Sequence, residues 1–374
     1  MTNGEKPVLS SQSDNRHYGL DALKFLSMVF VVMLHTIGRG GMYGNGDHLT
    51  RFVVMALFYI ATPAVNLFSI LTGYLSYSDN IKPLNRQRLI SLWLQVVFYS
   101  LLITISCHVL IPDAVIVTPK DYLASVFPLF FNTYWYFTAF FFISILSPLV
   151  NKAIRSLNDR DAKRVFIVLT FFCSILASLC YTRNLIESHS FAWLFSLYIL
   201  GAIIKKTRLG MSTPTTGLII GIIVCNIFNW LVTWIGENYV SGSDWYFAML
   251  SDYVSPTIVL QTFCYLFLFN RITVKGKLKN ILRFLSPSVF AAYLINTHPI
   301  VYVYLLENLF APLTEINPFV SALIVIAVSC AFVLCACLID KVRIALGKLL
   351  RLNMMIVRLE TLSFKITDSI TEKL

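Results

Sequence analysis

A lysine and a histidine stand eleven residues apart in the first long apolar segment of the chain, residues 19–38. His35 can act as a general base near neutral pH. Lys24, with Asp21 three residues before it, can hold an anionic group. On a helix, a step of eleven residues returns to within about 20° of the same face and covers about 16 Å. One helix face therefore links an anion site near the inner membrane boundary to a base in the outer half.

Ionisable side chains in such a segment need a reason to be there. An Asp or Lys at the centre of a membrane-spanning helix costs roughly 2.5–3.5 kcal/mol, and such residues commonly mark functional positions. Structural interpretations also exist. His35 can pack against a neighbouring helix, and Lys24 can pair with Asp21 at i, i+3 while its ammonium extends to the interface. Because the residues share one face, the sequence favours the functional interpretation.

Further candidate residues lie in later apolar segments. Arg86 and Arg88 open the third segment and can join Lys24 at the inner face, or can serve only to orient the chain. His298 precedes a proline that can open its helix locally. His108 has no such context, and we expect it to be structural. Trp135 lies in an aromatic run at the outer end of the fourth segment, where aromatic residues form an interfacial belt or stack on sugars.

Membrane helices must position these residues. The chain is 57% hydrophobic and 13% charged, with a mean hydropathy of +0.72, whereas soluble domains carry about 25% charged residues. We therefore predict an all-α polytopic membrane helical bundle with about ten transmembrane helices, each near the length that a bilayer requires. The predicted spans are 19–38, 52–76, 89–111, 128–150, 164–181, 191–204, 215–235, 253–270, 284–306 and 318–340.

The charge distribution predicts the orientation of the chain. Of the 30 Lys and Arg residues, 25 fall in one set of alternate loops and tails and four in the opposite set, with Lys24 inside a span. The positive-inside rule then places both termini in the cytoplasm. The net charge of +11 comes from these inner segments and does not indicate binding to nucleic acid.

Three regions follow from this pattern. We predict a polar cytoplasmic N-terminal tail over 1–18 with no cleavable signal peptide, and a transmembrane domain over 19–340. Residues 341–374 mix basic and apolar residues at helical spacing, which predicts a basic amphipathic tail on the inner leaflet or, alternatively, a solvated tail. All eight cysteines lie in apolar stretches and should be free thiols. We expect no metal site.

Four blocks of sequence resemble the acyltransferase-3 family of integral membrane acyltransferases. They are residues 17–35, 68–75 followed by Arg86 and Arg88, 135–149, and 286–295. The first block carries the family's basic residue, ten residues and then histidine. Two positions depart from the family pattern. Lys24 replaces the usual arginine and so lacks the bidentate guanidinium fork. Asn296 occupies a position where the family usually has histidine, and His298 follows two residues later.

The resemblance implies a function. Family members transfer an acyl group, usually acetyl, from cytoplasmic acetyl-CoA to a hydroxyl of a cell-surface or lipid-linked saccharide, in a bacterial cytoplasmic membrane. Acetyl-CoA would be a co-substrate, with no bound cofactor. His35 would act as the base or as an acyl relay. The residues expected to bind donor or substrate are Lys24, Asp21, Arg86, Arg88, Tyr74, Trp135 and His298.

Two other functions also fit a chain with buried charge. A transporter or flippase of lipid-linked sugars would use the same residues as a substrate pathway. Against it, the chain has no matching halves and no matched pair of interrupted helices. A polysaccharide polymerase is disfavoured because the predicted outer loops are short.

Overall fold

The computed structural model describes residues 16–80, 83–179, 186–239 and 252–371, with side chains to residue 365. Every regular element in these ranges is a helix, which confirms the all-α prediction. Within the described residues, six helical segments are long and apolar enough to cross a membrane. The prediction of ten spans, and of cytoplasmic termini, stays a prediction. The six are α1 (Tyr18–Ile37), α2 with α3 (His48–Ala61 and Ala64–Ser76), α4 (Arg86–Leu110), α6 (Trp135–Ser156), α10 (Thr215–Tyr239) and α15 (Pro318–Leu349).

Four predicted spans form shorter or interrupted helices. The segment 191–204 lies in α9 (Phe191–Thr207), and 253–270 contains α12 (Pro256–Phe269). The other two are divided into several pieces, and residues 180–181 of one lie outside the described residues. Segment 164–181 spans parts of α7 (Asp159–Thr170), η1 (Phe171–Leu176) and α8 (Ala177–Leu179). Segment 284–306 spans the end of α13 (Gly276–Leu285), then η3 (Ser286–Ser288), α14 (Val289–Asn296) and η4 (Val301–Leu305).

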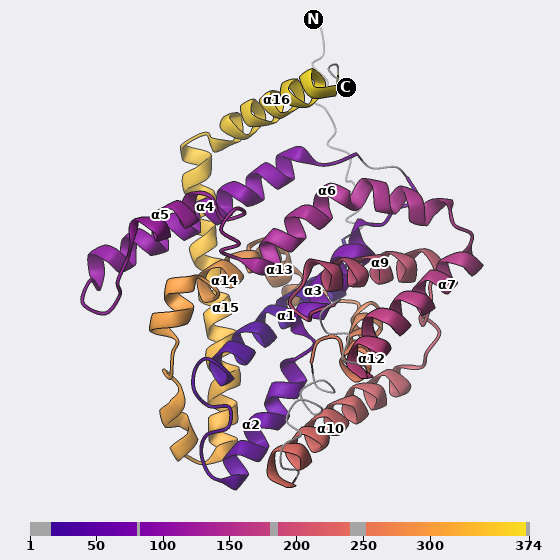
Figure 1. Ribbon diagram of the computed structural model, residues 1–374, viewed down its shortest axis with the longest axis vertical. Helices are drawn as coiled ribbons and strands as arrows, with labels where there is room; N and C mark the ends of the chain where they lie inside the picture. The colour runs from indigo at the N-terminus through magenta and orange to yellow at the C-terminus, as the bar shows by residue number, and fades with distance from the viewer. Residues whose placement is uncertain (1–15, 81–82, 180–185, 240–251, 372–374) are drawn as a thin grey trace, which may run out of the picture.

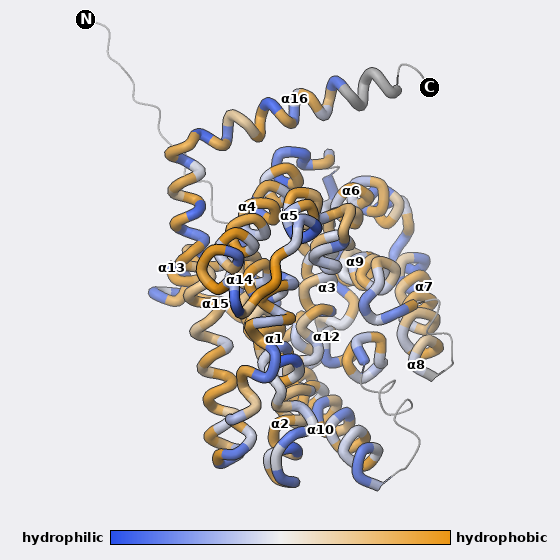
Figure 2. The backbone as a smooth tube through the Cα atoms, turned by 60° about the vertical axis from the view of Figure 1, so that its left-hand side comes forward, coloured by the Kyte–Doolittle hydropathy of each residue, from blue (hydrophilic) through white to orange (hydrophobic). Residues whose placement is uncertain are grey.

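Helix α1 lies in the centre of the bundle (Figure 1). It contacts α2, α3, α12, α14 and α15, and most of its side chains are buried. By contrast, α4, α10 and α15 expose many large apolar side chains, as the hydropathy of α4 and α15 in Figure 2 illustrates. Because water would penalise such a surface, these helices are suited to contact lipid. The ionisable residues of α1 are therefore held inside the protein.

Helices α3 and α9 approach each other closely because each has a glycine at the contact. A Cβ atom on Gly73 would lie 1.9 Å from the carbonyl oxygen of Tyr198, and one on Gly201 would lie 2.2 Å from that of Ile70. Small residues of this kind let the backbones of membrane helices meet. This pair supports α1 from one side, since α3 also packs on α1.

The C-terminal segment forms two helices rather than a single tail. Helix α15 continues to Leu349, nine residues beyond the predicted end of the last span. The chain then turns at Arg351, which has a φ of 52°, and α16 (Leu352–Thr371) lies across the end of the bundle (Figure 1). Hydrophilic and hydrophobic residues alternate along α16 (Figure 2), as expected for an amphipathic helix. Its position on a membrane leaflet stays a prediction.

The remaining described helices are short. They are α5 (Pro119–Val126), which packs on α4, and η5 (Ala311–Glu315), which packs on α15.

Candidate functional site

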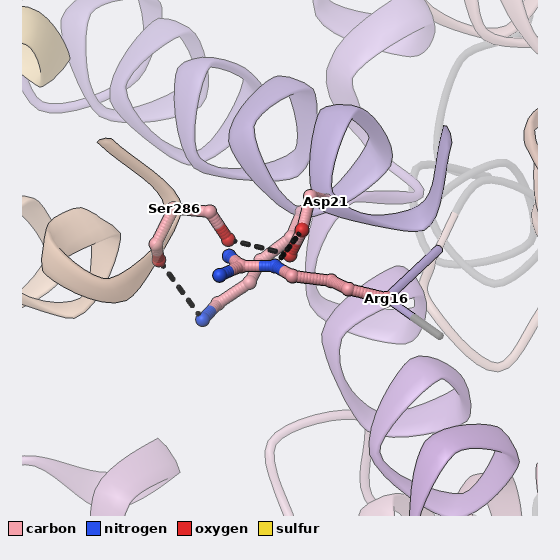
Figure 3. Close-up of polar contacts among 4 residues, drawn as sticks. Arg16, Asp21 and Ser286 are labelled. Atoms are coloured by element: carbon pink, nitrogen blue, oxygen red, sulfur yellow. Dashed lines mark hydrogen bonds and ion pairs between the residues drawn. The ribbon is translucent and has the colours of Figure 1, made fainter. Parts of the chain in front are cut away.

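The first turns of α1 carry a network of charged groups against η3 (Figure 3). Lys24 Nζ donates to the carbonyl oxygen of Ser286 at 3.2 Å. The Ser286 hydroxyl donates to Asp21 Oδ1 at 2.7 Å, and Arg16 Nε lies 2.5 Å from Asp21 Oδ2. Both carboxylate oxygens of Asp21 are thus engaged by groups other than Lys24. The expected direct pair of Lys24 with Asp21 is replaced by a bridge through Ser286.

This inner cluster carries more positive than negative charge. Arg16 and Arg88 both lie within electrostatic range of Lys24, as does Asp21. The Arg88 guanidinium is exposed and has no hydrogen-bond or ion-pair partner among the described residues. Three cations around one carboxylate make a site that favours an anion. We call Arg16, Asp21, Lys24, Arg88 and Ser286 the inner cluster.

Arg86 does not join the inner cluster. Its guanidinium lies 4.0 Å from the centre of the Phe364 ring and donates to the Ser363 hydroxyl at 3.2 Å. Both partners belong to α16. Side chains at i and i+2 on a helix point about 200° apart, so Arg86 and Arg88 face different neighbours even though they are close in the sequence.

At the other end of the helix face that begins with Lys24, His35 contacts Asn296, the last residue of α14. Its Nδ1 lies 2.5 Å from Asn296 Oδ1, and its ring packs edge-on against Tyr302 at 5.0 Å. An amide oxygen can only accept a hydrogen bond, so Nδ1 carries the proton. Nε2 then carries the lone pair, and no described side chain forms a hydrogen bond with it. This tautomer leaves Nε2 ready to accept a proton.

Helix α1 and the segment 286–296 run side by side in the same direction. Lys24 contacts Ser286, and His35 contacts Asn296. Eleven residues on α1 are thus matched by ten on the facing segment. Lys24 and His35 thus face the same segment, as the helical spacing predicts. Between them, none of residues 27–34 is more than 7% exposed, whereas Lys24 and His35 are only partly buried.

His298 is directed away from His35, toward α4 and α5. Its Nδ1 accepts from the Ile300 backbone at 3.3 Å, so its Nε2 carries the proton. Nε2 lies 3.3 Å from the Thr104 hydroxyl, which lies 2.9 Å from that of Ser125. The Ser125 hydroxyl in turn donates to the Asp121 carbonyl at 2.8 Å. This chain of hydrogen bonds joins α4 and α5 to the non-helical segment after α14.

The helix break at Pro299 explains the difference between the two side chains. Helix α14 ends at Asn296, as the proline predicts. Asn296 is therefore the last helical residue and faces α1, while His298 lies beyond the helix and follows a different direction. Asn296, not His298, is the residue that contacts His35.

Tyr74 and Trp135 lie in different surroundings. The Tyr74 hydroxyl donates to Asn270 Oδ1 at 3.1 Å, and Lys205 Nζ lies 4.6 Å from the centre of its ring. Trp135 begins α6, and its ring lies 5.0 Å from that of His189, just before α9. His189 is itself within electrostatic range of His35. Trp135 therefore belongs to the surroundings of His35.

The sequence analysis missed several residues near the site. Asp340 on α15 is fully buried and accepts from Gln95 and Tyr99 of α4 at 3.1 and 3.0 Å. Arg343 lies 2.6 Å from the same carboxylate oxygen. An acidic residue at the end of the last predicted span was the available signal. His189 gave no signal, because it lies in a loop and meets Trp135 only through the fold.

Within the described ranges, no group of three His, Cys, Asp or Glu side chains could hold a metal ion. The seven cysteines in these ranges are free thiols.

Comparison with known proteins identifies a family for most of the chain. The family model for acyltransferase 3, described as an acyltransferase domain, matches residues 17–340. No curated protein and no solved structure matches the chain. The matched range begins just before α1 and ends where the last predicted span ends. It therefore includes both Lys24 and His35.

Proposed function

The chain belongs to the acyltransferase-3 family, and from this premise we propose that it moves an acetyl group from cytoplasmic acetyl-CoA to a saccharide hydroxyl. The saccharide is a cell-surface or lipid-linked glycan, and the membrane is the bacterial cytoplasmic membrane. The observation that carries the proposal is the contact of His35 with Asn296, which leaves a basic nitrogen inside a membrane helix. The inner cluster, about 16 Å away along the same helix, supplies the site for an anionic donor.

The donor binds at the inner cluster through its phosphates. Lys24 has one of its three N–H groups on Ser286, which leaves the others for a ligand. Arg88 adds an exposed guanidinium that can contact phosphate with two parallel hydrogen bonds. Asp21 keeps Ser286 and Arg16 in place and so orients Lys24. Arg86 contributes to this end of the protein only indirectly, by holding α16 through Ser363 and Phe364.

The reaction takes place at His35. Nε2 accepts the proton of the acceptor hydroxyl as its oxygen attacks the thioester carbonyl. The tetrahedral intermediate then collapses, the C–S bond breaks, and the thiolate of CoA takes the proton from Nε2. The Asn296 oxygen holds Nδ1–H throughout and stabilises the imidazolium that forms. After one turnover the acetyl group is on the acceptor oxygen, the hydroxyl proton is on the CoA thiol, and His35 is again neutral.

The test uses membranes that contain the wild type or one of three variants, supplied with labelled acetyl-CoA. Wild type should label the extracted glycans, and His35→Ala should not. Lys24→Ala should retain transfer at high donor concentration, with a raised KM for acetyl-CoA. His108→Ala is the matched control, because His108 lies at the exposed outer end of α4 and should have no effect.

The results distinguish the competing functions. Wild-type-like labelling by a folded His35→Ala protein would overturn the role of His35. Absence of acetyl-CoA turnover by the wild type, together with uptake of lipid-linked sugar into vesicles, would favour the transporter. Label that remains on the protein after acid quenching, and only when His35 is present, would make His35 an acyl relay rather than a base.

A further inference from the structure

Six aromatic side chains lie near His35: five of them are joined by ring contacts, and the sixth packs on His35 itself. They come from α6, α14, η4 and the loops before α9 and α12. We call the six the aromatic collar: Trp135, Tyr136, His189, Tyr253, Tyr293 and Tyr302.

The ring contacts begin at His35 and Tyr302 and are found again between Tyr253, His189 and Trp135. His35 packs on Tyr302 at 5.0 Å, and Tyr302 lies within electrostatic range of Tyr253. Tyr253 lies 5.1 Å from His189, which lies 5.0 Å from Trp135.

The ring contacts continue from Trp135 to Tyr293 on α14. Trp135 lies 5.8 Å from Tyr136, and Tyr136 lies 5.9 Å from Tyr293. Tyr293 is one helical turn before Asn296, which contacts His35.

The rings of the collar are only partly buried. Each of its six side chains keeps accessible surface, as does His35. On the same stretch of chain, Tyr134 and Phe137 are 1% and 0% exposed, because they face α4. The collar therefore offers accessible ring surface on which a ligand can pack.

The chemistry of the collar favours a neutral polyhydroxylated ligand. Aromatic faces accept the C–H faces of a sugar ring, and hydroxyl and imidazole groups hydrogen-bond its hydroxyls. Among the described residues, Arg39 lies beside the collar, 5.8 Å from the centre of the Tyr302 ring, and Glu307 neutralises it at 3.1 Å. This contrasts with the inner cluster, where cations are in excess.

His189 provides a second imidazole opposite the first. Its Nδ1 lies 3.0 Å from the Ser188 hydroxyl, and no described residue hydrogen-bonds its Nε2. It is the most exposed member of the collar and lies within electrostatic range of His35. A sugar held between the two rings would present one hydroxyl to His35 and a neighbouring hydroxyl to His189.

We propose that the aromatic collar is the binding site of the saccharide acceptor, with His189 hydrogen-bonding a hydroxyl next to the one that is acylated and Trp135 stacking on the sugar ring. This inference rests on the proposed function for its substrate class. His189 acts as a specificity-determining residue, whereas His35 does the proton transfer.

The first experiment separates acceptor binding from donor chemistry. With purified protein, we would measure the KM for the acceptor glycan, the KM for acetyl-CoA, and the slow hydrolysis of acetyl-CoA by water. His189→Ala and Trp135→Leu should each raise the acceptor KM about tenfold, as expected for losing one hydrogen bond or stacking contact. They should leave hydrolysis and the KM for acetyl-CoA unchanged. An unchanged acceptor KM, or an equal loss of hydrolysis, would overturn the proposal.

The second experiment does not depend on acyl transfer. Chitotriose and maltotriose would be titrated into wild type, His189→Ala and the control His108→Ala by calorimetry. Binding of either sugar to wild type and to the control, but not to His189→Ala, supports the collar even if no acetyl-CoA is consumed. Failure of the wild type to bind both sugars counts against the collar and leaves the donor assay to decide the proposed function.

Discussion

His35 Nδ1 and Asn296 Oδ1 lie 2.5 Å apart, between α1 and the last residue of α14. The contact fixes which nitrogen of the imidazole carries the proton, because the amide oxygen can only accept. The resemblance to the acyltransferase-3 family implies histidine at the position of Asn296. Under the proposed function, a neutral amide would do in this chain what a carboxylate or second imidazole does in other base sites: it would orient the ring that takes the proton.

Replacing Asn296 tests this orientation. Asn296→Ala should lower kcat roughly threefold to tenfold, because a lost hydrogen bond of about 0.5–1.5 kcal/mol frees the tautomer and the ring. The KM for acetyl-CoA should not change, since the donor binds at the other end of α1. Steady-state kinetics on purified protein measure both values. A normal kcat in the alanine variant would show that the contact has no catalytic role.

The two arginines at the start of α4 should behave differently. Arg88→Ala should raise the KM for acetyl-CoA about threefold to tenfold at low salt, and the effect should shrink as salt screens the exposed guanidinium. Arg86→Ala should leave this KM near the wild-type value, because its partners are Ser363 and Phe364.

The Arg86 variant should instead loosen α16. Hydrogen exchange over residues 352–365 should become faster in Arg86→Ala and stay unchanged in Arg88→Ala. Equal effects of the two substitutions on donor KM would contradict the different placement of the two side chains.

His189 should make the protein sensitive to acid. Partial desolvation of its ring, which still keeps accessible surface, lowers the pKa of His189 below the ordinary value of 6.5, and nearby Asp252 and Glu187 only partly oppose this. As the pH falls below that ordinary value, the unfolded chain binds the proton first, so the stability that neutral His189 supports is progressively lost. Between about pH 7 and about pH 5, the apparent Tm should fall less in His189→Gln than in wild type. His108→Gln is the control, and an identical pH dependence in all three proteins would refute this role.

The close approach of α3 and α9 predicts an intolerant glycine. Gly73→Ala would place a Cβ 1.9 Å from the Tyr198 carbonyl oxygen, so the helices must separate at a cost of about 1–3 kcal/mol or more. Gly217→Ala is the matched control on α10, where the nearest atom would be 3.5 Å away. Helix propensity should make that change neutral or stabilising by up to about 1 kcal/mol. Thermal unfolding in detergent compares the two; equal Tm values would disprove the tight contact.

Helical periodicity was sufficient to predict that Lys24 and His35 share one face of α1. A step of eleven residues placed Lys24 and His35 on one face, and both contact the segment 286–296. Pro299 likewise predicted the end of α14. The same rule, applied to Arg86 and Arg88, would have placed them on different faces, because side chains two positions apart on a helix point in nearly opposite directions.

Other features depend on contacts that the sequence does not encode locally. The aromatic collar combines side chains from five parts of the chain, and His189 has no neighbouring pattern that marks it. Nothing in the composition of residues 171–176 marks the π-helical turn that they form. Asp340 lay at a predicted boundary, where an acidic residue is ordinary, and only the fold shows that it is fully buried.

The packed stretch of α1 between Lys24 and His35 also bears on the membrane as an electrical barrier. A cell that stores energy as an ion gradient cannot keep a continuous column of water through one of its proteins. Residues 27–34, none more than 7% exposed, leave almost no water-accessible surface along α1 between Lys24 and His35. The polar groups at the two ends of α1 are therefore separated by a packed segment, as a membrane that holds such a gradient requires.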